Sequence, residues 1–177
     1  MSELTFATIS GVTLHYTLDG LPAGVPLVFL NSLGTDLRIW DRVIPHLANR
    51  YRLIRYDKRG HGLSDSPPGP YTIRSHADDL AGLLAYLQVD EVILLGVSVG
   101  GMIAVDYAAS RPQQVKALVL CGAEDGATPP ELVRGLAEAL PNARFEVMEQ
   151  AGHIPSLEQP AMLAAKIDQF LSENGYV

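Results

Sequence analysis

Hydrophobic and polar residues alternate near the amino end of the chain. Residues 12–18 are hydrophobic at every second position, which is typical of a half-buried antiparallel strand. The preceding apolar stretch, residues 4–9, is separated from them by Ser10-Gly11, a dipeptide that favours a tight turn. The pattern therefore predicts an antiparallel hairpin at the start of the chain.

Beyond residue 25, continuous apolar runs alternate with stretches of helical period. Such runs are typical of strands buried on both faces of a sheet, and a period of about 3.6 residues indicates amphipathic helices. Strands that alternate with helices pair in parallel through right-handed crossovers. The sequence therefore predicts an α/β fold, with a mostly parallel sheet flanked by helices. The expected strands are 26–30, 51–56, 91–95, 115–121 and 144–148, and the expected helices are 37–48, 73–87, 100–109, 130–140 and 161–171.

Composition narrows the class of protein. The 177 residues suit a single domain with its own core. A net charge of -7 argues against nucleic-acid partners and against anionic membranes. A single cysteine, Cys121, excludes an intramolecular disulfide, and the first residues lack the basic and apolar regions of a signal peptide. We expect a cytoplasmic protein that does not associate with membranes.

The segment Gly96-Val97-Ser98-Val99-Gly100 lies between an expected strand and an expected helix. This is the context in which a G-x-S-x-G segment presents a nucleophilic serine. The two glycines relieve crowding at a sharp turn because they lack a Cβ atom. The turn would lift the Ser98 hydroxyl to the carboxyl edge of the sheet, where open α/β sheets bind ligands.

A serine needs a base, and His153 and Asp125 are the predicted partners. Both residues follow expected strands, so they should meet Ser98 at the same edge of the sheet. The chain order Ser, Asp, His is the order expected for this arrangement. His153 would take the serine proton and Asp125 would orient the imidazole. Glu124 is the rival acid.

The backbone N–H groups of Leu33 and Val99 are the predicted oxyanion hole. Val99 begins the helix after the serine, and Leu33 lies in the loop after the strand 26–30. Thr128 is the expected N-cap of the helix that begins at Pro130.

The other histidines are less suited to the role of the base. We expect His15, in the hairpin, and His46 and His76, on helices, to be solvated, and His61 to hold a loop. Cys121 is expected to be a small buried group. The spacing of histidines and cysteine matches no metal site, and the glycine-rich turn lacks the residues of a phosphate loop, so no metal and no cofactor is expected.

These motifs resemble the α/β-hydrolase superfamily, and most of all the 3-oxoadipate enol-lactonases. The segments that carry the resemblance are 31–40, 56–64, 96–101, 122–125 with 128–130, and 152–155 with 158–160. The resemblance implies a substrate-binding role for Asn31, Ser32 and Trp40, and an ester or lactone as the small-molecule substrate.

The chain departs from that family after residue 121. Members of the family continue there into a helical cap and a further strand before the acid loop, whereas here residues 115–121 run directly into Gly122-Ala123-Glu124-Asp125. We therefore expect one core domain, 1–177, without a cap domain and without one core strand between about 121 and 122. Loss of a cap exposes apolar surface, so we expect a homodimer or higher homo-oligomer, with strand exchange as one route.

The leading hypothesis is a serine hydrolase that cleaves carboxylic esters or lactones through an acyl-enzyme. The alternative is a cap-deleted scaffold that is weakly active or inactive and that serves binding or assembly. Perhydrolysis is a third reading, and haloalkane dehalogenation is disfavoured because it requires a carboxylate at position 98.

Overall fold

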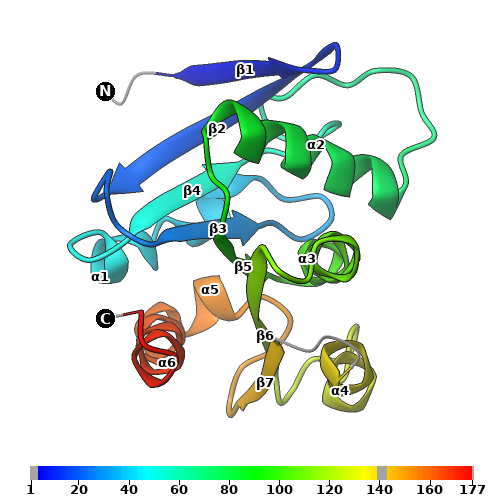
Figure 1. Cartoon of the computed structure of the whole chain (residues 1–177). Coiled ribbons are helices and arrows are strands. Elements are labelled where there is room, and N and C mark those ends of the chain that lie inside the picture. The colour runs from blue at the N-terminus through cyan, green and yellow to red at the C-terminus, as the bar shows by residue number, and fades with distance from the viewer. Residues whose placement is uncertain (1–3, 139–142, 177) are drawn as a thin grey trace.

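The computed structural model describes residues 4–138 and 143–176 of the chain. Within these residues a seven-stranded sheet has the order β1-β2-β4-β3-β5-β6-β7 (Figure 1). Pairs β1–β2 and β2–β4 are antiparallel, and the pairs from β4 through β7 are parallel. The predicted fold class is confirmed. The strands are β1 (Thr5–Ile9), β2 (Val12–Gly20), β3 (Pro26–Leu30), β4 (Arg52–Tyr56), β5 (Val92–Gly96), β6 (Val115–Gly122) and β7 (Ala143–Met148).

The predicted hairpin is present at the amino end. Ile9 pairs with Val12, and both turn residues have positive φ, 49° at Ser10 and 82° at Gly11. A two-residue turn of this kind matches the right-handed twist of the strands that it joins.

Helices cover both faces of the sheet (Figure 1). Helices α2, α3 and α4 lie on one side, and α1 and α6 lie on the other. Each side has its own apolar cluster, one around Leu80 and Ile103 and one around Trp40 and Ile167. The helical elements are η1 (Leu37–Trp40), α1 (Ile44–Leu47), α2 (Ile73–Tyr86), α3 (Val99–Ser110), α4 (Pro130–Glu138), α5 (Pro155–Glu158) and α6 (Pro160–Glu173).

One expected helix is divided in two. Residues 37–48 were predicted as a single helix, but they form the 3₁₀ turn η1 and the short helix α1. Pro45, in the first turn of α1, has no N–H to donate to a carbonyl in the preceding turn, so a continuous helix would lose a bond there. The apolar positions are still buried, because Trp40, Val43 and Leu47 face the same core.

The acid loop follows β6 directly. The strand ends at Gly122, and Asp125 follows it without an intervening cap domain. Expected helix residues 139 and 140 lie outside the described residues.

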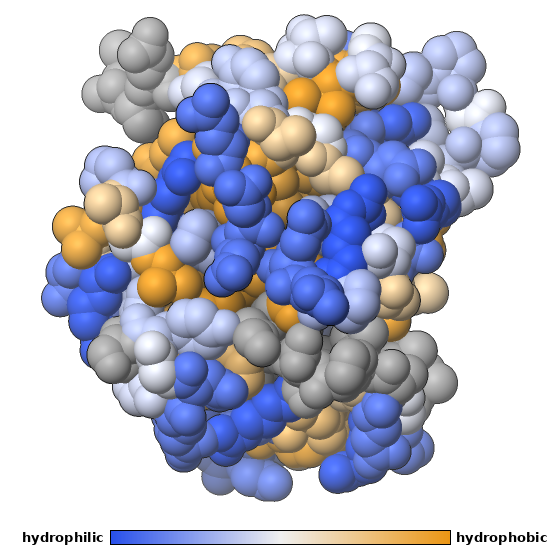
Figure 2. Space-filling model, in the orientation of Figure 1, coloured by the Kyte–Doolittle hydropathy of each residue, from blue (hydrophilic) through white to orange (hydrophobic). Residues whose placement is uncertain are grey.

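The visible face of the molecule is a mixture of hydrophilic residues and smaller hydrophobic areas (Figure 2). In the described part of the chain, no helix combines the length and apolar character that crossing a membrane requires. The cytoplasmic location stays a prediction.

Candidate active site

Ser98 lies at the sharp turn between β5 and α3. Its backbone angles, φ 55° and ψ -122°, are ones that residues with a side chain rarely adopt. A Cβ atom on Gly96 would lie 2.5 Å from the backbone of Gly100, and one on Gly100 would lie 2.0 Å from the Leu30 oxygen. The glycines of the motif are therefore required because three backbone segments pass close together at this turn.

The Ser98 hydroxyl is not used to hold the helix. Ser98 is the N-cap residue of α3, but its side chain makes no capping hydrogen bond. The residue is half-buried and lines a cavity at the carboxyl end of β5. Ser98 thus lies at the carboxyl edge of the sheet, the position predicted for a nucleophile.

His153 and Asp125 meet at the same cavity. His153 Nδ1 lies 2.9 Å from each carboxylate oxygen of Asp125. Glu124, the rival acid, is exposed to solvent. Ser98 and His153 line the same cavity, but no hydrogen bond joins these two described side chains. Such contacts are often long before substrate binds and shorten in the complex.

Asp125 is held as a carboxylate by its neighbours. Its oxygens accept hydrogen bonds from the Ala127 and Thr128 N–H groups, both at 2.9 Å, and from the Thr128 hydroxyl at 2.6 Å. Burial raises the pKa of Asp125, but the hydrogen bonds from Thr128, His153 and Ala127 outweigh it, so the pKa lies below its ordinary value. The Thr128 hydroxyl thus helps to hold Asp125, and its expected capping role stays a prediction.

The loop that carries His153 is fixed by Glu158, on α5. One carboxylate oxygen accepts from the Gly152 N–H at 2.7 Å, and the other accepts from the Ile154 N–H at 2.9 Å. Gln159 adds hydrogen bonds to the Glu149 and Gln150 carbonyls. Neither residue was predicted to be functional. The sequence signal was Glu158, an acid five positions after His153. Its role becomes clear only in the structure, where the His153 loop folds back onto the Glu158 carboxylate.

The buried side chain of Lys58 holds the loop after β3 in place. Its ammonium donates to the carbonyls of Asn31 and Ser32, each at 3.0 Å. Burial lowers the pKa of Lys58 to about 8, although the nearby Asp57 carboxylate opposes the shift. This lysine was not singled out by the sequence, because a single Lys in a polar loop resembles any solvated one.

Asn31, Ser32 and Trp40 are all buried in this region. The Trp40 indole N–H donates to Asn31 Oδ1 at 2.8 Å, and Asn31 Nδ2 donates to the Tyr56 carbonyl at 3.0 Å. None of these three is among the described residues that line the cavity beside Ser98. Their visible contacts support the loop that bears Leu33, and their direct contact with a substrate stays a prediction.

The two predicted oxyanion donors lie at the ends of the elements that the sequence indicated. Val99 begins α3, where the first N–H groups of a helix have no partner within it. Leu33 follows Ser32 in the loop after β3, and its side chain is exposed. The next residue, Gly34, donates its N–H to His61 Nε2 at 3.2 Å, which fixes the loop.

The cavity beside Ser98 has a volume of about 230 Å³. It opens between α3, the end of β6, α4 and the His153 loop. Ser98, Asp125 and His153 all line it, as does Cys121. Burial raises the pKa of the Cys121 thiol to about 11, so this buried residue is a neutral group, as expected.

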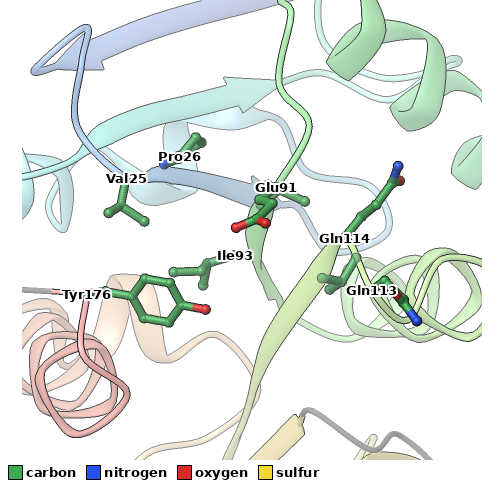
Figure 3. A pocket seen from close by; sticks show the side chains of 9 residues that line it. Val25, Pro26, Glu91, Ile93, Gln113, Gln114 and Tyr176 are labelled. Carbon is green, nitrogen blue, oxygen red and sulfur yellow. The ribbon is translucent and has the colours of Figure 1, made fainter.

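A second hollow, of about 340 Å³, lies at the opposite end of the strands (Figure 3). Glu91, Gln113 and Gln114 surround it, with Tyr176 pointing in from the carboxyl terminus. Although it is larger, it lies at the amino ends of β3, β5 and β6, away from Ser98. Ligands of open α/β sheets bind at the carboxyl ends, so the cavity beside Ser98 is the candidate site.

Two histidines differ from the sequence expectation. His15 is buried, because β2 lies between β1 and β4 and the loop after β4 covers its second face. His76 is also buried; burial, and next the Lys58 charge, lower its pKa to about 4. His46 is exposed and His61 holds the Gly34 loop, both as predicted.

Comparisons with known proteins agree with this fold. A family model described as alpha/beta hydrolase fold matches residues 25–124, and one described as TAP-like protein matches residues 101–175. The chain is similar to 3-oxoadipate enol-lactonase 2 of Acinetobacter baylyi, with 35% identity over 113 residues, 64% of this chain and 42% of that protein. It is also similar to 2-(acetamidomethylene)succinate hydrolase of Mesorhizobium japonicum, with 33% identity over 63% of this chain and 39% of that one.

Two solved structures align with nearly all of this chain. The enol-lactonase of Burkholderia xenovorans LB400 has a TM-score of 0.82 and 25% identity, with 95% of this chain and 100% of that chain covered. A hydrolase of Pseudomonas aeruginosa has a TM-score of 0.88 at 24% identity, a likeness of fold alone. The chain spans about two fifths of the length of the curated relatives it matches. From its fold and from the family model that covers more than half of its length, the chain belongs to the alpha/beta hydrolase fold family.

Proposed function

We propose that this chain hydrolyses carboxylic esters or lactones through an acyl-enzyme formed on Ser98. The observation that carries the proposal is the meeting of Ser98, on its strained turn, with the His153–Asp125 pair at one cavity. The relatives named as enol-lactonases and as a hydrolase support the same class of reaction.

In the proposed mechanism, the Ser98 oxygen attacks the substrate carbonyl carbon while His153 takes the hydroxyl proton. Negative charge develops on the carbonyl oxygen, where the N–H groups of Leu33 and Val99 would receive it. Asp125 stabilises the imidazolium through the contact at Nδ1. Collapse of the tetrahedral intermediate expels the alcohol, which takes the proton from His153, and water then cleaves the acyl-enzyme by the same steps.

The test compares wild type with Ser98→Ala on short p-nitrophenyl esters and with a fluorophosphonate probe. We expect the variant to lose activity by on the order of 10⁴-fold or more, and the probe to label Ser98 alone. Ser110→Ala, at the other end of α3, is the matched control and should keep wild-type activity. Equal rates for wild type and Ser98→Ala would refute the proposal.

The inactive-scaffold alternative is less well supported, because the relatives are named as hydrolases. A fluorophosphonate probe separates the two readings, since only an activated serine reacts. The homodimer or higher oligomer stays a prediction. Leu33, Met102 and Leu157 are exposed apolar side chains in or beside the elements that form the site, which supports that prediction.

A further inference from the structure

The walls of the cavity beside Ser98 are mainly apolar. Val97 and Gly101 lie near the serine, Met102 and Val105 come from α3, and Val133 comes from α4. Cys121 contributes a neutral thiol, whose Sγ is engaged with the Thr128 carbonyl at 3.1 Å. The acyl group stays bonded to Ser98 after the first step, so it remains beside these walls until water cleaves it.

The fixed charge at this cavity is negative. Asp125 is buried and lines the cavity as a carboxylate. Among the described residues that line it, none is Lys or Arg. Arg134, the residue after Val133 on α4, lies over the Phe145 ring, with its guanidinium carbon 4.8 Å from the ring centroid. A carboxylate on the acyl group would therefore lose its water against apolar walls and would face Asp125 without a lysine or arginine partner.

Cavity size sets a second limit. The cavity volume of about 230 Å³ lies below the roughly 300–1,000 Å³ that is typical of small-molecule sites. A short or singly branched aliphatic acyl chain fits this space.

From these walls, this charge and this volume, we propose that the site takes uncharged esters with small aliphatic acyl groups and rejects acyl groups that carry a carboxylate. The inference rests on the proposed function of Ser98. It separates this chain from the relative named as a 3-oxoadipate enol-lactonase, because an acyl group derived from 3-oxoadipate carries a second carboxylate. The acyl specificity of this chain would then differ from that of this relative, although the reacting groups are of the same kind.

The experiment compares two esters of nearly equal shape, ethyl 4-methylpentanoate and monoethyl succinate, at pH 7.5. The isopropyl end of the first has the outline of the carboxylate end of the second. Product acids are measured by chromatography, with Ser98→Ala as the blank. We expect kcat/KM to be on the order of 100-fold higher for the uncharged ester.

A charge introduced at the wall tests where the discrimination arises. Met102→Lys places an ammonium beside the cavity. We expect this variant to lower the ratio of kcat/KM for the uncharged ester to kcat/KM for the charged ester by about tenfold. Met162→Lys is the matched control on α6, since both methionines are 46% exposed and Met162 does not line the cavity. That variant should keep the wild-type preference.

The outcomes distinguish failure of the inference from failure of the proposed function. Equal or faster hydrolysis of monoethyl succinate by wild type overturns the inference and leaves the proposed function standing. The inference is also overturned if Met102→Lys and Met162→Lys change the preference equally. The discrimination between the two esters would then not arise at the cavity wall that carries Met102. If neither ester is hydrolysed and the fluorophosphonate does not label Ser98, the proposed function itself fails.

Discussion

The molecule contains two histidine–aspartate pairs with nearly the same geometry. His15 Nδ1 lies 2.8 Å from Asp57 Oδ2, and His153 Nδ1 lies 2.9 Å from Asp125 Oδ2. In both pairs the carboxylate also accepts backbone N–H groups, from Leu37 and Leu63 in the first and from Ala127 and Thr128 in the second. Seen as pairs alone, either could orient an imidazole.

Their surroundings differ. The His15 side chain is 7% exposed, and its Nε2 atom is buried with no hydrogen-bond partner among the described residues. The His153 side chain is 33% exposed and lines a cavity together with a serine. The difference shows that a histidine–aspartate pair becomes a candidate base only where its second nitrogen can reach a nucleophile and a substrate.

The largest expected effect comes from removing one charge from each pair. We expect Asp125→Asn to lower kcat by about 10⁴-fold, because the amide no longer fixes the imidazole tautomer or stabilises the imidazolium. We expect Asp57→Asn to change kcat little and to lower the free energy of unfolding by about 2–3 kcal/mol. Ester hydrolysis measures kcat, and urea unfolding measures the free energy of unfolding. A folded Asp57→Asn protein that is as inactive as Asp125→Asn would break the distinction.

The pH dependence of stability should be governed by the region of the first pair. The pKa of Lys58, beside Asp57, is lowered by burial from 10.5 to about 8. Between these two values the unfolded chain binds a proton that the folded chain does not, so stability rises with pH, by at most about 3 kcal/mol. In the Lys58→Met variant, the free energy of unfolding should no longer rise over this pH range. Urea unfolding between pH 7.5 and 10 tests it, and identical pH profiles for the two proteins would contradict it.

The smallest expected effect concerns one hydroxyl at the second pair. We expect Thr128→Val to lower kcat about tenfold, because Asp125 loses a donor that helps to hold it as an oriented carboxylate. Thr17→Val is the control, since the Thr17 hydroxyl also donates to an aspartate, Asp19, at 3.3 Å, but far from Ser98 in the hairpin strand β2. Equal activities for the two variants, measured with the same ester, would show that Thr128 does not serve catalysis.

The sequence determined the fold class and most element positions, because the period of apolar residues directly reflects burial in strands and helices. It also located the Ser98 turn, since Gly96 and Gly100 are needed wherever backbone segments approach too closely for a Cβ atom. It predicted one continuous helix over residues 37–48, where the chain forms η1 and α1 because Pro45 cannot donate a backbone hydrogen bond. These properties are local, or depend on one neighbouring turn.

Only the tertiary structure decided which histidine is buried, which acid contacts His153, and what Lys58, Thr128 and Glu158 hold in place. Alternation along β2 shows that His15 points away from the core side, but not that the loop after β4 covers it. The physical reason is that such contacts join residues far apart along the chain, and their distances are set by how the sheet, helices and loops pack together. The spacing of residues in the sequence does not contain that information.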